Sequence, residues 1–186
     1  MSVLDVIHAR RSIKDFTARE VAREEIERIL EAAAQAPNHR MTQPWRFYVL
    51  GPEARYGFGA ALGARKAKKV EDPDAAKAVL TKVAESHRDL PGMLAVAMTL
   101  DDNPEIREED YAATFMAVQN LCLAAHTGGL GTHIRSGAVM DDPAARAAVG
   151  VPEGQRIVAT ISIGEPVKVP DAKPRRAASE VTTWVP

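Results

Sequence analysis

The chain has 186 residues, of which 46% are hydrophobic and 26% are charged, and its formal net charge is −1. This length and composition predict a globular protein of one-domain size with a proper core. Neither half of the chain is strongly basic, so the charge distribution gives little support for binding to nucleic acid or to a membrane surface. The one cysteine, Cys122, excludes an intrachain disulfide framework and fits a reducing compartment.

The N-terminal residues and the hydropathy pattern indicate a cytoplasmic protein. Residues 2–5 carry an early charge and begin no long apolar core, so we expect no signal peptide. The longest apolar run, residues 93–100, is far shorter than the roughly 20 residues that span a bilayer. We therefore expect no membrane association.

The first two predicted elements are helices. Ser2 can cap the first helix, with Asp5 three residues later as in a capping box, and this helix ends at the turn 10–12. The second helix covers about residues 23–35, where apolar residues recur at the spacing of one buried stripe. Pro37 disfavours helix at the residue before it and so ends the second helix.

A strand, two helices and a second strand are predicted next. Alternating bulky residues over 45–50 predict a half-buried strand, whose core side would carry Trp45, Phe47 and Val49. Residues 53–65 favour a helix despite three glycines, and Asp72-Pro73 begins a further helix that extends to about residue 90. The run 93–100 lacks alternation, which is typical of a fully buried central strand.

A long helix is expected from residue 104 to about Thr127, where Gly128-Gly129 can end it through a left-handed residue. Its second half is apolar nearly all round, so we expect this helix to run through the middle of the molecule. The next elements are a glycine-rich loop, a short helix and a last alternating strand, predicted over residues 131–137, 142–150 and 157–163.

The segment 165–186 contains four prolines and little periodicity, yet it ends on Val181, Trp184 and Val185. Disordered tails seldom end on a tryptophan flanked by β-branched residues. We therefore expect residues 1–164 to form a single domain, and residues 165–186 to be a C-terminal extension that packs on a partner subunit.

The signatures of several function classes are absent from the sequence. No Gly-x-Gly-x-x-Gly follows a strand, and neither a Walker loop nor a Gly-x-Ser-x-Gly motif occurs. We expect no metal, because none of the histidines has metal-site spacing: His8, His39, His87, His126 and His133. Arginines and hydroxyl groups at element ends remain, with no obvious nucleophile, which suits a cofactor that brings its own reactivity.

Two Arg-Ser pairs are the main candidates for ligand binding. The turn 10–12 can be explained as a helix end, since the helix macrodipole favours cations there. Alternatively, guanidinium groups hold a phosphate dianion bidentately. Arg135-Ser136 offers the same groups after a glycine-rich turn, and two such pairs in one small domain favour phosphate binding.

Four stretches resemble the nitroreductase family in their order and spacing. They have the sequences RRSIKDF (10–16), AP with QPWRF (36–37 and 43–47), GLGT with RSG (129–132 and 135–137), and IGEP (163–166). The resemblance covers essentially the whole chain, and it is to the short branch of the family in particular.

This resemblance implies an α+β fold with a central, largely antiparallel sheet flanked by helices, assembled as an intertwined homodimer. It also implies two FMN sites in the dimer interface, so that the dimer binds one FMN per subunit. The cofactor-binding residues that it implies are Arg10, Arg11, Ser12, Ile134, Arg135 and Ser136, with Gln35, Asn38 and His39 reaching the flavin from the partner subunit. His39 is equally well explained as a loop histidine at a helix end. Residues 124–129 would border the face where nicotinamide approaches, although a helix cap explains their glycines just as well.

The activity implied by the resemblance is FMN-dependent oxidation of NAD(P)H. The electron acceptor would be a small molecule such as a nitroaromatic, a quinone or a related compound. It would be reduced in a ping-pong hydride-transfer cycle that requires no catalytic side chain. One alternative is a protein that stores, delivers or senses FMN with little turnover. Another is an interaction protein that retains only the fold.

Overall fold

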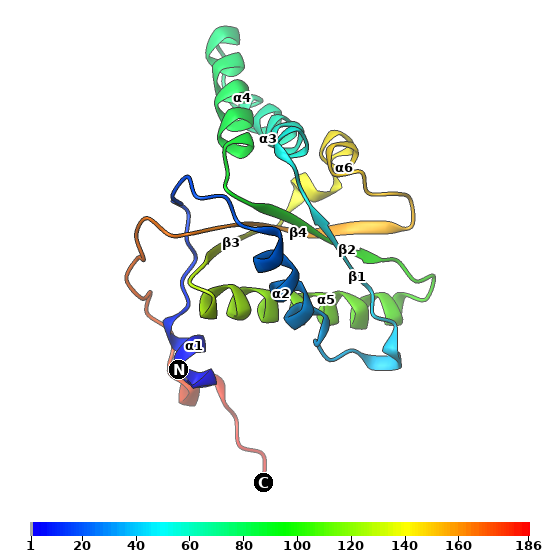
Figure 1. The fold of residues 1–186 in the computed structure, drawn as a ribbon. Helices are drawn as coiled ribbons and strands as arrows, with labels where there is room; N and C mark the ends of the chain where they lie inside the picture. Colours follow the sequence, from blue (N-terminus) through cyan, green and yellow to red (C-terminus); the bar gives the residue numbers. More distant parts are fainter. Residues whose placement is uncertain (1) are drawn as a thin grey trace.

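The computed structural model describes residues 2–186, in which a four-stranded sheet has helices packed on both of its faces (Figure 1). The strands are β1 (Trp45–Val49), β2 (Met93–Thr99), β3 (Gly131–Arg135) and β4 (Gln155–Gly164), and their order in the sheet is β1-β2-β4-β3. All three neighbouring pairs are antiparallel. The expected α+β fold with an antiparallel central sheet is therefore confirmed.

The central strand β2 explains why its sequence lacks alternation. Leu94, Val96 and Met98 pack into a core between the sheet and the helices α2 (Arg23–Ala34) and α5 (Pro104–Thr127). Met93 and Ala95 point to the opposite face, where α3 (Pro52–Ala67) and α6 (Pro143–Val149) complete a second core. Because both faces of β2 are covered, every position from 93 to 98 is buried and apolar.

The predicted helix boundaries are close to the observed ones, because local capping determines them. The capping box of Ser2 and Asp5 is present at α1 (Val3–Ala9). The side chain of Asp72 accepts from the N–H of Ala75 at the start of α4 (Pro73–Arg88), and Gly150 ends α6 in the left-handed conformation. Each of α3, α4, α5 and α6 begins with a proline, whose missing N–H costs nothing at this position.

One sequence prediction about the strands was wrong, and another holds only in part. Val49 lies on the same face of β1 as Trp45 and Phe47, opposite Leu94, but it is 58% exposed at the end of the strand. Tyr48, on the other face, is partly buried and donates to Gln155 Oε1 at 2.6 Å. Residues 131–135 are not a loop but the edge strand β3, paired with residues 160–164 of β4. The pairing partner is distant in the sequence, so local composition could not indicate this strand.

Helix α5 packs under the sheet rather than through the centre of the described chain (Figure 1). It buries Ala117, Val118 and Leu121 against the sheet and α2, while Tyr111 and Met116 remain about two-fifths exposed. The expectation that this helix runs through the middle of the molecule is therefore wrong for the single chain. Within residues 2–186, no helix has both the length and the hydropathy required to cross a membrane.

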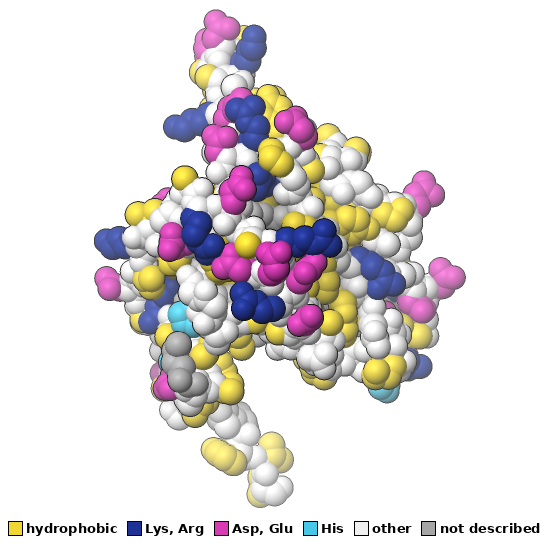
Figure 2. All heavy atoms as spheres, viewed as in Figure 1, with side chains coloured by type: hydrophobic (Ala, Val, Ile, Leu, Met, Phe, Trp, Pro, Cys, Tyr) yellow, Lys and Arg dark blue, Asp and Glu magenta, His cyan; other side chains and the backbone are white. Residues whose placement is uncertain are grey.

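The C-terminal segment leaves the domain beside the residues that follow α1. The N–H of Thr17 donates to the carbonyl of Glu165, and the N–H of Val167 donates to that of Asp15. Beyond this point the segment projects from the body of the molecule (Figures 1 and 2). Trp184 is 90% exposed, so the apolar end of the segment does not fold back on its own domain.

Candidate functional site

The first Arg-Ser pair is attached to β3 through the backbone. Ser12 and Thr132 form a parallel bridge, and the N–H of Ile13 donates to the Thr132 carbonyl at 2.9 Å. Gly131 permits this close approach, because a Cβ atom there would lie 2.7 Å from the Cβ of Ile13. The turn after α1 is therefore held beside the strand that carries Arg135.

Arg135, at the end of β3, is a half-buried cation. Burial lowers the pKa of its guanidinium below the usual value, and no opposing charge or hydrogen bond within residues 2–186 offsets this shift. Charged groups that are taken partly out of water normally have an ionic or hydrogen-bonding partner. The free guanidinium of Arg135 is therefore suited to binding an anion.

Lys14 and Lys66 each lie near a histidine that also lies near Arg135. Burial lowers the pKa of His133, and the charges of Arg135 and Lys14 lower it further. Burial is also the main cause of the lowered pKa of His87, to which Arg135 and Lys66 add in the same direction. In the described chain, neither Lys14, Lys66 nor Arg135 has a carboxylate oxygen within 4.0 Å. This region is electropositive and favours a phosphate group.

Arg10 and Arg11 have different environments at the end of α1. The Nη1 group of Arg11 donates to the carbonyl of His8 at 2.6 Å and to that of Arg10 at 2.9 Å. Its guanidinium therefore satisfies the end of the helix, as the simpler explanation of this turn expected. Arg10 lies near the buried thiol of Cys122. Burial raises the pKa of this thiol, and a hydrogen bond with Thr132 and the charge of Arg10 offset part of the rise. Arg10 is thus the guanidinium of this pair that remains available to a ligand.

Ile134 and Ser136 flank Arg135 in the chain. Ile134 is 37% exposed on the edge strand, paired with Ile161 of β4, and Ser136 is exposed directly after the strand ends. Both residues lie near the cationic groups through their position on β3. The structure therefore places Ser12 beside Thr132, three residues before Arg135 on β3, while Arg10 lies near Cys122 on α5.

The remaining predicted site residues lie at or beside the elbow, which we define as residues 36–43 between α2 and β1. Gln35 is the exposed C-terminal cap of α2. The Nδ2 group of Asn38 donates to the His39 carbonyl at 2.8 Å and to Thr42 Oγ1 at 2.6 Å. The Nδ1 atom of His39 lies 3.0 Å from Glu109 Oε1. The polar groups of Asn38 and His39 therefore already have partners within the chain.

The elbow and α1 lie near opposite ends of α5 (Figure 1). The elbow contacts Glu109, whereas Arg10 is near Cys122. These two positions on α5 are separated by about 20 Å, at a rise of about 1.5 Å per helical residue. Within residues 2–186, Asn38 and His39, with Gln35 just before the elbow, therefore lie far from the turn that carries Arg10.

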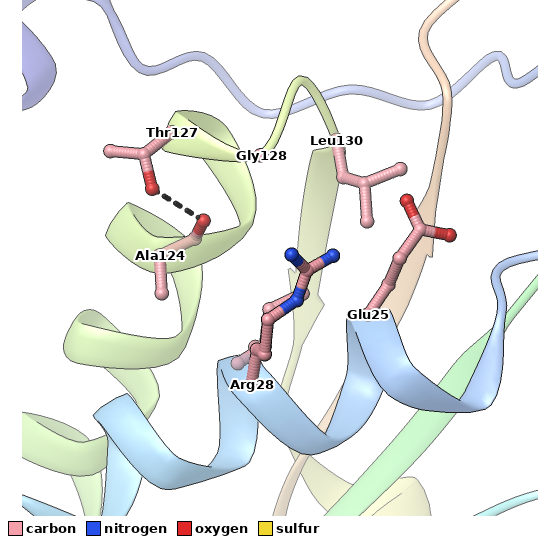
Figure 3. A pocket seen from close by; sticks show the side chains of 7 residues that line it. Glu25, Arg28, Ala124, Thr127, Gly128 and Leu130 are labelled. Atoms are coloured by element: carbon pink, nitrogen blue, oxygen red, sulfur yellow. Dashed lines mark hydrogen bonds between the residues drawn. The ribbon is translucent and has the colours of Figure 1, made fainter.

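A pocket of about 300 Å³ lies between α2 and the C-terminal end of α5 (Figure 3). Glu25 and Arg28 extend from α2 into this pocket, opposite the turn in which the Thr127 hydroxyl donates to the Ala124 carbonyl at 2.8 Å. The turn ends with Gly129 at φ 78°, so the helix-cap explanation of these glycines is confirmed. None of the predicted cofactor residues lines the pocket.

Sequence reasoning missed the residues that hold the elbow and the turn after α1 in place. Glu109 and Asp110 contact the elbow, and Thr132 accepts the backbone bond from Ile13. The two acids are among many on the polar part of α5, and Thr132 is one of several small residues in its stretch. No local signal distinguishes them, because their roles come from contacts between distant segments.

The sequence model of the nitroreductase family matches residues 7–165. A relative in Bacillus subtilis (strain 168), named "Putative NAD(P)H nitroreductase YfhC", is 35% identical over 171 residues, which cover 92% of this chain and 88% of that protein.

Solved structures give the same result at the level of the fold. A nitroreductase-like family protein from Bacillus cereus superposes with a TM-score of 0.86 at 29% identity, covering 100% of this chain and 96% of the other. The FMN and NADPH-dependent nitroreductase NfnB from Sphigopyxis sp. strain HMH has a TM-score of 0.79 at 21% identity, with 100% and 99% coverage. The family match spans both Arg-Ser pairs, the elbow and all four strands, and the chain belongs to the nitroreductase family.

Proposed function

We propose that the protein is an FMN-dependent oxidoreductase that transfers hydride from NAD(P)H to nitroaromatic, quinone or related acceptors. The names of its relative in B. subtilis and of NfnB support the electron donor, the cofactor and the reaction class. The observation that carries the proposal is the half-buried guanidinium of Arg135, which is on the strand that the Ser12–Thr132 bridge attaches to the turn after α1 and has no partner within residues 2–186.

The residues around Arg135 fit the phosphate end of FMN. Arg135 and Arg10 supply planar guanidinium groups, which bind phosphate oxygens in pairs. Ser12 and Ser136 are both exposed and supply hydroxyl groups for the phosphate and the ribityl chain. The backbone of Ile134, on the edge strand, is assigned to the ring. Arg11 supports this group indirectly, because it closes the end of α1 behind Arg10.

The side chains bind and orient, and none is assigned as a catalytic acid or base. When bound, FMN supplies the acceptor and donor of hydride in the two halves of the cycle. The cations around Arg135 hold the phosphate, so the position of the flavin ring is determined by an anchor at its far end. Donor and acceptor occupy the same face in turn, which corresponds to a ping-pong order.

The site is completed by a second copy of the chain. The elbow lies about 20 Å from the cations of its own chain along α5, so Gln35, Asn38 and His39 serve the cofactor of the other subunit in a homodimer. The exposed apolar side chains of residues 181–185 project from the domain and dock on that subunit. In this arrangement residues 1–164 form the flavin-binding domain and residues 165–186 the extension.

The absorbance spectrum of the purified protein tests the proposal. We expect flavin bands, release of FMN and not FAD on denaturation, and loss of the bands when NADH or NADPH is added without oxygen. Steady-state oxidation of the nicotinamide with a quinone or a nitroaromatic acceptor then separates an enzyme from a protein that stores or senses FMN. A protein that takes up no FMN, or that binds FMN without turnover, would contradict the proposal.

A further inference from the structure

The elbow has an unfavourable backbone conformation. Arg40, Met41 and Gln43 have φ values of 60°, 52° and 45°, in the left-handed region that residues other than glycine seldom adopt. Such residues keep this conformation only where surrounding contacts stabilise it. Arg40 and Met41 are also exposed, so burial of their side chains in this chain does not hold them.

Two adjacent acids on α5 provide the stabilising contacts. Glu109 accepts from His39 Nδ1 at 3.0 Å through Oε1 and from Arg40 Nε at 3.4 Å through Oε2. Asp110, only 4% exposed, accepts from the Thr42 hydroxyl at 2.5 Å. One carboxylate therefore holds the start of the strained segment and the other holds its end.

The contact of Asp110 also orients Asn38. A hydroxyl has a single hydrogen to donate, and Thr42 gives it to Asp110, so its oxygen is left to accept from Asn38 Nδ2 at 2.6 Å. With Nδ2 turned to Thr42, the Oδ1 atom of Asn38 lies 3.4 Å from the N–H of Gln43, which donates to it. The chain of bonds from Asp110 through Thr42 thus sets which way the Asn38 amide points.

We propose that Glu109 and Asp110 form a latch on α5 that holds the elbow in the conformation required by the cofactor site. Both are positioning residues, since they act on the site through His39, Arg40, Thr42 and Asn38. The proposal rests on the proposed function for its consequence, FMN binding, but the latch itself can be measured without any cofactor. Removal of either contact frees the left-handed segment to relax to more favourable backbone conformations.

Trypsin provides the first measurement, because Arg40 is an exposed cleavage site inside the latched segment. Cleavage requires the elbow to open, and its rate follows the population of the open form. In flavin-free protein, Glu109→Gln and Thr42→Val should each be cleaved after Arg40 about three- to tenfold faster than the parent chain, as expected for the loss of one charged contact or buried hydrogen bond. Glu108→Gln is the matched control, since Glu108 has no contact with the elbow and should change the rate less than about twofold.

FMN titration, followed by quenching of flavin fluorescence, gives the second measurement. Glu109→Gln and Thr42→Val should raise the dissociation constant of FMN by roughly the same factor as the cleavage rate, while thermal unfolding of the flavin-free domain remains near that of Glu108→Gln. Equal cleavage of the parent chain and both latch variants overturns the latch. Faster cleavage with unchanged FMN affinity overturns its role in the cofactor site. A parent chain that binds no FMN instead overturns the proposed function, and the cleavage rates still test the latch.

Discussion

Ser12 and Thr132, which are 120 positions apart in the sequence, form a parallel bridge that joins the end of α1 to β3. This bridge attaches the first Arg-Ser pair to the strand that carries Arg135, whose guanidinium has no hydrogen-bond or ionic partner within residues 2–186. The bridge does not depend on side-chain chemistry, because the hydrogen bond next to it runs from the Ile13 N–H to the Thr132 carbonyl. Variants of the binding side chains can therefore be tested without disrupting the attachment.

Replacement of Arg135 by Ala should weaken FMN binding by about 1.5–3 kcal/mol, the usual contribution of a hydrogen bond to a charged group. Arg135→Lys should recover only part of this loss, because a point charge replaces a planar group with paired donors. The measurement is a fluorescence titration of flavin-free protein with FMN. The control is Arg28→Ala, which removes a cation from the pocket between α2 and the C-terminal end of α5 and should leave FMN affinity unchanged. Equal FMN affinity of Arg135→Ala and the parent chain would contradict the role of this residue.

The crossing of α3 and α4 depends on two glycines. A Cβ atom at Gly59 would lie 2.7 Å from the Cβ of His87, and one at Gly63 would lie 2.9 Å from the Cα of Leu80. Gly63→Ala should therefore lower the free energy of unfolding by about 1–3 kcal/mol, because the backbone of α4 must move. The control is Gly51→Ala, where a Cβ atom meets nothing within 4 Å, and its effect should remain within about 0.5 kcal/mol. Urea denaturation measures both variants, and equal stabilities would show that the helices separate at no cost.

His87 should make the stability of the protein depend on pH. Burial lowers the pKa of this side chain, which is 8% exposed, below the ordinary value of 6.5. The unfolded chain therefore takes up a proton at a higher pH than the folded chain does. The contribution to stability is present above about pH 6.5 and is lost as the pH falls towards the lowered folded pKa.

The pH effect can be assigned by substitution. We expect urea midpoints of the parent chain to fall between pH 7 and pH 5, and His87→Gln to reduce that fall. His8→Gln alters an exposed histidine on α1 and serves as the control. A fall of the same size in His87→Gln and in the parent chain would place the responsible group elsewhere, with His133 as the next candidate because burial lowers its pKa too.

Deletion of residues 178–186 should weaken both the homodimer and the retention of FMN. The deleted segment carries Val181, Trp184 and Val185, which are 64%, 90% and 84% exposed on the single chain. Large interfaces of this type commonly bury more than about 2,000 Å² and leave no stable monomer. Sedimentation velocity and the ratio of bound flavin to protein measure the two effects. An intact protein that sediments as a monomer with stoichiometric FMN would exclude the dimer and the assignment of Asn38 and His39 to it.

Helix boundaries and the buried character of β2 could be predicted from the sequence because they depend on neighbouring residues. Ser2, Asp72 and Gly150 act within one helical turn of their positions. An apolar run of strand length between turn residues indicates a strand covered on both faces, as 93–98 proved to be. The predictions that failed concern features that depend on contacts between distant residues. Residues 131–135 contain three charged or polar side chains and a glycine, and only pairing with β4 makes them a strand.

The same distinction between local and distant contacts applies to the candidate site. The sequence by itself indicated the candidate groups for a phosphate, since Arg10, Arg11, Ser12, Arg135 and Ser136 are cations and hydroxyl groups at element ends. Only the tertiary structure decided that Arg11 is engaged by its own helix end, that Arg135 is free, and that Glu109 holds the elbow. Capping and periodicity depend on residues that are close together in the sequence. Whether a guanidinium has a partner depends on which distant segments the sheet order brings together, and that order results from the packing of the whole domain.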